Sequence, residues 1–449
     1  MSNLSTQHDT HEILAEQKQF AWRSEAYAWC VVVLLILALT LSMIDRMILT
    51  LLVGPIKADF GLSDTQISLL HGLAFTLLYV VAGLPMGRLA DHYSRRAIAG
   101  WSVFSWSLAT AMCGVTNNFW QLFVSRVCVG IGEAGLSPAA VSMISDYFSK
   151  AKVAKPIAYY SIGASAGAGL AYIFGGVVVD YVSTLGPVTI PVFGVIRPWQ
   201  LAFFAVGLPG ILFAAVFMFV REPKRNKTQQ EIEAGERVPV SEVVAFFMRH
   251  KDFLILQLGA ASMAALAILS LHAWMPAFLM RTYGLSPGQA GTGYGVAVLI
   301  GGVSGLLLTG WLSNHWTAKG MRAAHIRIAC LSVAISTIPA VLTPLVPNFY
   351  LSIILSGFAV FGFAAAIALA PVALQVSVPN NMRGQIYAFY LLTISVLGYT
   401  VGPMIVALIT DLVFQDEMKV GLSMALVVAI AGPVSAIGFG LARTKYFGE

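Results

Sequence analysis

The sequence has very little charge for its length. Only 11% of its 449 residues are Asp, Glu, Lys or Arg, whereas 58% are hydrophobic; in a soluble domain about a quarter of the residues are charged. The length would suffice for two or three soluble domains, but this scarcity of charge excludes an ordinary soluble protein. The class that remains is a polytopic membrane protein.

Cysteine is also scarce, and a secretion signal is missing. The four cysteines, Cys30, Cys113, Cys128 and Cys330, all fall within apolar runs. We therefore expect free, buried thiols rather than disulfides or metal ligands, with no metal site and no cofactor. Residues 1–27 are polar and mixed in charge, and the apolar run after them is too long for the core of a cleavable signal peptide.

Twelve apolar runs are long enough to cross a membrane, which takes about 20 residues each. They are continuous rather than alternating in polarity, so they predict helices and not the strands of a barrel. The runs begin near residues 28, 65, 97, 119, 156, 198, 253, 290, 325, 350, 384 and 420.

The basic residues indicate how these helices are oriented. With a cytoplasmic N-terminus, 21 of the 27 Lys and Arg fall in inner segments and four in outer loops, while Arg46 and Arg126 lie inside spans. Such an excess marks the cytoplasmic side, and it explains the net charge of +6 without a nucleic-acid partner. We expect a monomer in a prokaryotic inner membrane, with both termini cytoplasmic.

An internal repeat divides the chain into two halves. "DFGLSDTQ" (59–66) matches "TYGLSPGQ" (282–289), and "LPMGRLADHY" (84–93) matches "LLTGWLSNHW" (307–316) in the same register. Parallel repeats of this kind are typical of secondary transporters. The predicted fold is an all-α membrane protein, with twelve transmembrane helices in two pseudo-symmetric six-helix bundles.

The repeat and the apolar runs together define five regions. A plain tether between the halves is expected in the linker, and a short amphipathic helix on the inner membrane surface over 241–251 is the alternative. The regions are a cytoplasmic segment (1–27), the first bundle (28–220), a cytoplasmic linker (221–252), the second bundle (253–442) and a cytoplasmic tail (443–449).

Two motifs resemble those of the major facilitator superfamily. "GRLADHYSRR" (87–96) resembles its cytoplasmic loop motif, and "RVCVGIGEAG" (126–135) resembles its fourth-helix signature. Together with the context "GEAGLSP" around Glu133, the chain is similar to the spinster branch, which moves sphingolipids and lysophospholipids. Organic-anion:proton symporters are the competing branch. In the second half Asn314 replaces the motif's Asp91, which weakens the expectation of a matching loop there.

Four charged residues inside spans are the candidate substrate and proton-coupling residues: Asp45, Arg46, Arg126 and Glu133. A charge in the bilayer is costly, so it is expected to face a polar cavity or a partner. Arg126 and Glu133 are seven residues apart and share a helix face. Asp45 and Arg126 are expected at a similar depth, roughly 10 Å from the outer surface. The alternative is a fixed ion pair that only holds helices together.

The loop motif supplies a candidate cytoplasmic gate: Gly87, Asp91, Arg95 and Arg96. Asp91 is expected to cap the cytoplasmic start of the eleventh helix near 383–384 in the outward-open state, because helix N-termini attract anions. Arg95 and Arg96 would steady it. For these two arginines, ordinary charge anchoring on the inner side is the alternative.

The predicted function is a transporter, not an enzyme. The resemblance implies proton-coupled alternating access, and the deep charges of the first half facing an apolar second half favour an amphiphilic lipid as substrate. A sugar-acid:proton symporter is the alternative. No nucleophile–base set or metal cluster indicates a lipid enzyme, and the repeat argues against a receptor or channel. "GIGEAG" (130–135) follows no strand, so its glycines predict close helix packing rather than a dinucleotide site.

Overall fold

The structure is a computed structural model that describes residues 25–149, 151–191, 194–225, 239–379 and 381–447. The predicted N-terminal segment lies almost wholly outside these residues, as does much of the linker.

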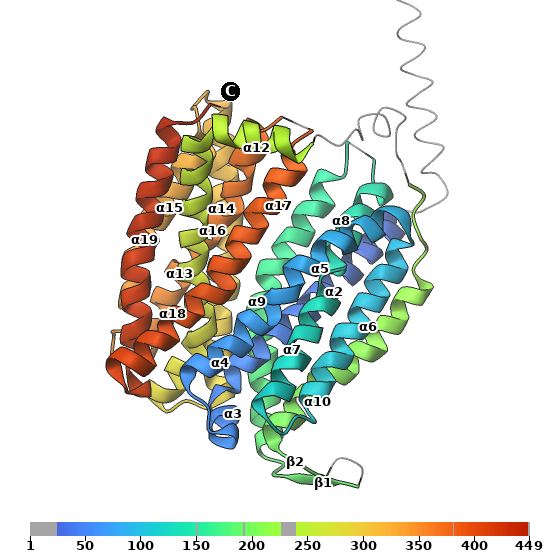
Figure 1. Cartoon of the computed structure of the whole chain (residues 1–449), viewed down its shortest axis with the longest axis vertical. Coiled ribbons are helices and arrows are strands. Elements are labelled where there is room, and N and C mark those ends of the chain that lie inside the picture. Colours follow the sequence, from blue (N-terminus) through green and yellow to red (C-terminus); the bar gives the residue numbers. More distant parts are fainter. Residues whose placement is uncertain (1–24, 150, 192–193, 226–238, 380, 448–449) are drawn as a thin grey trace, which may run out of the picture.

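Two helical bundles lie side by side (Figure 1). The first bundle consists of α2 (Glu25–Leu51), α3 (Val53–Phe60), α4 (Asp64–His71), α5 (Leu73–His92), α6 (Arg95–Cys113), α7 (Phe119–Glu133), α8 (Leu136–Tyr147), α9 (Ala154–Ser183), α10 (Pro198–Ala214) and η1 (Ala215–Phe219). A hairpin of β1 (Val188–Ile190) and β2 (Gly194–Ile196) connects α9 to α10, and the sequence did not indicate it.

The second bundle follows the short helix α12 (Val240–Arg249). It consists of α13 (Lys251–Tyr283), α14 (Pro287–Ala318), α15 (Ala324–Leu342), α16 (Phe349–Ser377), α17 (Arg383–Ile394), the π-helix η2 (Ser395–Val401), α18 (Gly402–Leu408), the π-helix η3 (Ile409–Phe414), η4 (Glu417–Lys419) and α19 (Val420–Thr444).

The described residues contain 11 helical segments that are long and apolar enough to cross a membrane. The remaining predicted span is α6, which is less apolar and packs between α7 and α10. The predicted all-α membrane fold in two bundles is therefore confirmed. We call the end that carries α3 and the hairpin the outer end and the opposite end, with α12 and the C-terminus, the cytoplasmic end, following the charge distribution (Figure 1).

The repeated sequence encodes the same local structure twice. Gly61 ends α3 with φ +64°, a conformation that glycine adopts without strain. Ser63 then caps α4: its hydroxyl accepts from the Gln66 N–H at 3.2 Å, and the Gln66 side chain accepts from the Ser63 N–H at 3.0 Å. The second copy has the same geometry at Gly284, Ser286 and Gln289. Both second spanning helices thus begin with one motif.

Glycines let the helices approach closely, as predicted for "GIGEAG". A Cβ on Gly130 would lie 2.2 Å from the Phe75 carbonyl oxygen, and one on Gly132 would lie 2.6 Å from the main-chain nitrogen of Trp106. Between the bundles, a Cβ on Gly291 of α14 would lie 2.4 Å from the Tyr172 carbonyl oxygen of α9. Backbone contact of this kind replaces the hydrophobic driving force that lipid removes.

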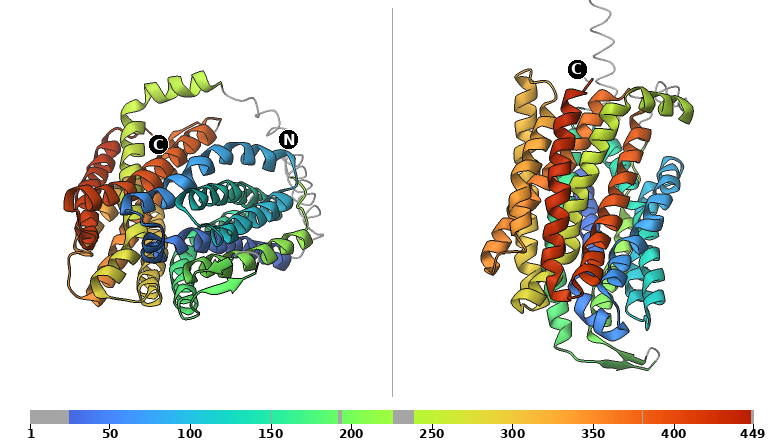
Figure 2. Two further views of the ribbon diagram at one scale, coloured as in Figure 1. Left: turned by 60° about the horizontal axis from the view of Figure 1, so that its bottom comes forward. Right: turned by 60° about the vertical axis from the view of Figure 1, so that its left-hand side comes forward.

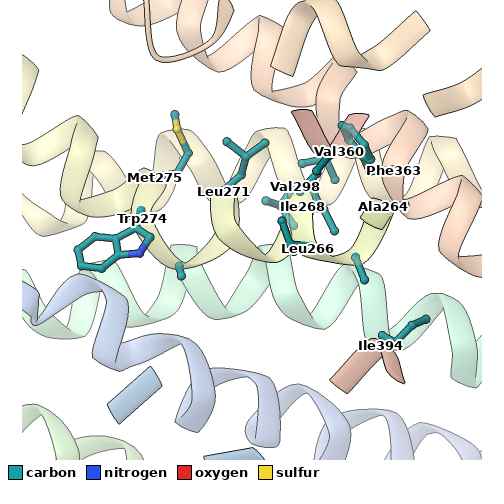
Figure 3. Packing of buried hydrophobic residues seen from close by; sticks show 14 of the residues in the cluster. Ala264, Leu266, Ile268, Leu271, Trp274, Met275, Val298, Val360, Phe363 and Ile394 are labelled. Carbon is teal, nitrogen blue, oxygen red and sulfur yellow. The ribbon is translucent and has the colours of Figure 1, made fainter. Parts of the chain in front are cut away.

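The second bundle is built around α13. Figure 3 shows Trp274, Leu271 and other apolar side chains of this helix beside Val298 of α14 and Phe363 of α16. The Trp274 side chain is fully buried, and its indole N–H donates to the Pro403 carbonyl at 3.0 Å. A buried indole is satisfied in this way.

The helix α12 lies across the ends of the spanning helices (Figure 2). Its side chains Phe246 and Phe247 contact Phe447 and Phe389, with ring centroids 6.2 and 5.8 Å apart. The alternative of a short helix over 241–251 therefore holds in place of a plain tether, since α12 spans Val240–Arg249, although its contact with a membrane surface stays a prediction.

All four cysteines are free, as expected, but their predicted burial is wrong for two of them. Cys113 is buried, whereas Cys30 and Cys128 are exposed on the outside of the bundle. An apolar run has a face toward lipid as well as a face toward protein, so hydropathy alone does not tell which side chains are covered by protein.

Replacing Gly291 with Ala should weaken the contact between the bundles, because the new methyl group would press on the α9 backbone. Gly310→Ala is the matched control on the same helix, since nothing lies within 4 Å of its Cβ position. We expect Gly291→Ala to cost about 1–3 kcal/mol, measured as a lower melting temperature in detergent. An equal effect of both substitutions would contradict the packing argument.

Candidate substrate and coupling site

A buried ion pair joins α2 to α7. Arg46 Nη2 lies 2.5 Å from Glu133 Oε2, and the Ser42 hydroxyl donates to the same oxygen at 2.7 Å. The Arg46 and Glu133 side chains are only 9% and 2% exposed. Glu133 is the last residue of α7, just before the chain turns into α8. Two of the four predicted residues therefore form a direct pair.

Three aromatic rings surround the guanidinium of Arg46. Its Cζ lies 4.1 Å from the centre of the Phe75 ring, 5.5 Å from Tyr79 and 5.3 Å from Tyr399. Tyr399 belongs to η2 of the second bundle, so the ion pair lies at the boundary between the bundles. A desolvated cation is stabilised by such rings. Phe75 and Tyr399 carry no signal in the sequence that marks them as partners, since only the folded structure brings them to Arg46.

The π-helix η2 packs directly on the break between α4 and α5. A Cβ on Gly72 would lie 2.4 Å from the Tyr399 carbonyl oxygen and 2.9 Å from the Thr400 Cα. Single-turn π-helices are frequent at functional sites. Here the irregular segment of the second bundle touches the irregular segment of the first, beside the ion pair.

Asp45 and Arg126 come together as predicted, but not as a side-chain pair. Arg126 Nη1 donates to the Asp45 main-chain carbonyl at 3.0 Å, and both side chains are buried. Among the described residues, Oδ1 of Asp45 and Nε and Nη2 of Arg126 have no hydrogen-bond partner.

Further buried polar atoms near these residues lack a hydrogen-bond partner within the described chain. A buried polar group without a partner is costly, so each requires an explanation such as water, a ligand or a second conformation. These atoms are Glu133 Oε1, Arg46 Nε, His71 Nε2, Thr76 Oγ1, Trp106 Nε1 and Thr110 Oγ1. The site therefore has unused capacity to bind polar groups or protons.

Arg95 of the predicted gate is a buried anchor within the first bundle. Its guanidinium pairs with Asp146 of α8 and with Glu222 at 2.9 Å, and it donates to the Pro223 carbonyl at 2.7 Å. Its side chain is only 1% exposed. Arg95 therefore ties α6 to α8 and to the segment that follows η1.

Arg96 also contacts this segment. Its N–H donates to Glu222 at 2.9 Å, and its guanidinium donates to the Val220 carbonyl at 2.9 Å. Asp91 is exposed and makes no hydrogen bond or ion pair among the described residues, and Gly87 faces open space. The expected contact of Asp91 with the eleventh helix is absent from this conformation and stays a prediction for the outward-open state.

Charged residues join the two bundles at the outer end. Arg281 of α13 binds Asp64 of α4 through two nitrogens, at 2.7 and 2.8 Å. Lys57 lies 2.5 Å from Asp64 and 2.8 Å from Glu417, which also lies 3.2 Å from Arg281. The bundles are therefore held together on the outer side of the Arg46–Glu133 pair.

Comparison with known proteins identifies relatives along nearly the whole chain. The family model for the Major Facilitator Superfamily matches residues 35–403. An MFS-type efflux pump of Mycolicibacterium smegmatis is 30% identical, with 93% of each chain covered. A probable L-galactonate transporter of Escherichia coli is 27% identical, covering 73% of this chain and 71% of the relative.

One solved structure is similar in both sequence and fold. It is the crystal structure of a bacterial homolog to the human lysosomal transporter spinster, in an inward-facing and unoccupied conformation. It is 27% identical, with a TM-score of 0.79 and coverage of 94% of this chain and 98% of that chain. The expected likeness to the spinster branch is confirmed.

Removing the Arg95 side chain should destabilise the first bundle, because Asp146 and Glu222 would lose their contacts with the buried guanidinium. We expect Arg95→Ala to cost about 3 kcal/mol, seen as a lower melting temperature in detergent. Arg88→Ala is the control, since Arg88 is an exposed arginine of the same motif. If the two variants melted alike, Arg95 would be an ordinary surface charge and not an anchor.

Stability should fall in acid through Glu222. Burial alone raises the pKa of Glu222, but hydrogen bonds from the Arg96 and Arg95 N–H groups and the Arg95 and Ser94 side chains outweigh it, so the pKa lies below its ordinary value of 4.5. This contribution is therefore fully present above pH 4.5 and is lost as the pH falls through the lowered pKa. Melting temperatures measured below pH 4.5 should decline more steeply for wild type than for Glu222→Gln.

Proposed function

The chain belongs to the major facilitator superfamily, and we propose that it moves an amphiphilic lipid, such as a lysophospholipid or a sphingolipid-like molecule, by proton-coupled alternating access. It is a transporter of the spinster-like type and not an enzyme. We propose the class of substrate, the coupling to protons, and the residues that bind the substrate and exchange the protons.

The observation that carries the proposal is the buried Arg46–Glu133 pair at the boundary between the bundles. Arginine keeps its charge and binds phosphate or carboxylate with two nitrogens. An anionic head group would compete with Glu133 for Arg46, and protonation of Glu133 would release Arg46 to the substrate. The Ser42 hydroxyl could keep its hydrogen bond to Glu133 Oε2 after Arg46 is released. Glu133 Oε1, which has no hydrogen-bond partner among the described residues, could take the proton.

Asp45 and Arg126 form the second part of the proposed network. Among the described residues, two guanidinium nitrogens of Arg126 and one carboxylate oxygen of Asp45 have no hydrogen-bond partner. Asp45 is next to Arg46 on α2, and Arg126 contacts the Asp45 main chain. Release of Arg46 from Glu133 would therefore also change the electrostatic environment of Asp45.

The second bundle favours a substrate with an apolar tail. In the described parts of its spanning helices, Asp, Glu, Lys and Arg occur only near the helix ends, as at Arg281, Arg383 and Asp411. A head group at Arg46 or Arg126 would therefore face an apolar wall. This asymmetry fits an amphiphile better than a molecule that is polar throughout.

A sugar-acid:proton symporter is the second candidate, and two observations favour it. One relative described above is a probable L-galactonate transporter. The free Nε and Nη2 of Arg126 would suit a carboxylate.

In the proposed cycle the loop motif acts at the cytoplasmic end. Asp91 would cap α17 near Arg383 in the outward-open state, with Arg95, Arg96 and Gly87 shaping the loop. The same cycle requires regions 28–220 and 253–442 to move as separate bundles, with 221–252 as the linker and 443–449 as a tail on the cytoplasmic side.

Proteoliposome transport tests this function. Uptake of a lysophospholipid or sphingosine phosphate is measured with and without an imposed pH gradient, for wild type and for Glu133→Gln. We expect the gradient to stimulate wild-type flux and Glu133→Gln to lose that stimulation, because its neutral amide cannot exchange a proton. Glu242→Gln on α12, where the side chain is exposed, is the matched control.

The outcomes separate the two candidates. Lipid flux without any response to Glu133→Gln would remove Glu133 from the coupling network. Absence of lipid flux from folded protein, together with gradient-driven uptake of L-galactonate, would replace the lipid by a sugar acid and leave the coupling network in place.

A further inference from the structure

We propose that Asp180 and Asp411 are positioning residues of the transport cycle, which hold the outer end closed by capping the second spanning helix of the opposite bundle. This inference rests on alternating access, as proposed above, but not on the identity of the substrate.

Asp411 lies at the outer end of the eleventh span and reaches across to the first bundle. Its Oδ2 accepts hydrogen bonds from both the N–H and the hydroxyl of Thr65, each at 2.7 Å. Thr65 is the second residue of α4, so the carboxylate binds the first turn of the second spanning helix.

Asp180 makes the corresponding contact from the first bundle to the second, but with the side chain of the N-cap residue and not with a main-chain N–H. Its Oδ2 accepts from the Ser286 hydroxyl at 2.8 Å, and Ser286 is the N-cap of α14. The carboxylate also lies over Gly288, where a Cβ would approach Oδ2 to 2.1 Å. Glycine at this position therefore leaves room for Asp180 on the first turn of α14.

The two contacts are related by the internal repeat. In each, the outer end of the fifth span of one bundle meets the start of the second span of the other. Those starts are the two copies of the repeated cap, at Ser63–Gln66 and Ser286–Gln289. Asp180 and Asp411 lie in different stretches of sequence, yet they arrive at equivalent places.

The partial charges at helix ends explain why these contacts favour the closed outer end. An acidic residue in the last turn of a helix is disfavoured, because that end carries partial negative charge. Asp180 lies near the end of α9 and Asp411 near the end of η3. The positive N-terminal ends of α14 and α4 compensate for this only while the bundles touch, so opening the outer end would leave both carboxylates in an unfavourable place.

The neighbouring charges reinforce the same edge. Asp64, adjacent to Thr65, binds Arg281 of the second bundle, and Lys57 binds Glu417. The contacts of Asp411 and Asp180 occur at both second spanning helices, α4 and α14. Among the described residues, the charge cluster of Asp64 and Arg281 occurs at α4. The caps therefore account for closure at both second helices.

The test measures how far the outer end opens, without any substrate. Spin labels at Asn117→Cys in the first bundle and Leu345→Cys in the second, in a background lacking the native cysteines, report the distance between outer ends by pulsed electron paramagnetic resonance. We expect Asp411→Ala and Asp180→Ala each to raise the ratio of open to closed molecules by about 3- to 10-fold. The double variant should multiply the two effects.

The matched control is Asp59→Ala. Asp59 is an outer carboxylate that binds Arg197 and Trp199 of its own bundle, so its loss should leave the open fraction unchanged. Melting temperature is measured in parallel, because a merely structural carboxylate would lower it without moving the distance distribution. Unchanged distances in both capping variants, or an equal shift in Asp59→Ala, would overturn the proposal, and neither result depends on lipid transport.

Discussion

The need to pair a charge inside the membrane is the constraint on which the site depends. Arg46 lies inside the apolar helix α2, five residues before its end at Leu51, where an unpaired cation is costly. Glu133 and Ser42 meet its guanidinium, and three aromatic rings enclose it. Since one of these rings belongs to the second bundle, the contacts that stabilise Arg46 also fix how the two bundles meet beside it.

The apolar environment of the membrane also explains how the helices pack around the Arg46–Glu133 pair. Lipid is as apolar as the side chains of the spanning helices, so helices gain by bringing backbones close together. Gly130 and Gly132, which precede Glu133, allow α7 to touch α5 and α6 almost backbone to backbone. The glycines of "GIGEAG" therefore position the carboxylate rather than binding a ligand themselves.

Polar contacts differ between the two ends of the molecule. At the outer end, hydrogen bonds and ion pairs join the bundles, as between Arg281 and Asp64. At the cytoplasmic end, the arginines of the loop motif bind within the first bundle, through Glu222 and Asp146. This distribution corresponds to a molecule closed on the outer side.

The sequence by itself determined the membrane class, the apolar spans and, through its internal repeat, the two-bundle fold, because hydropathy and repeats can be recognised along the chain without tertiary contacts. It also identified Arg46 and Glu133, since charges inside apolar runs are conspicuous. The tertiary structure alone decided that Arg46 pairs with Glu133 and that Arg126 binds the main-chain carbonyl of Asp45. It also decided that Tyr399 is one of the three aromatic rings around Arg46. Partners like these lie on different helices, and their contact depends on rotations and depths that periodicity does not specify.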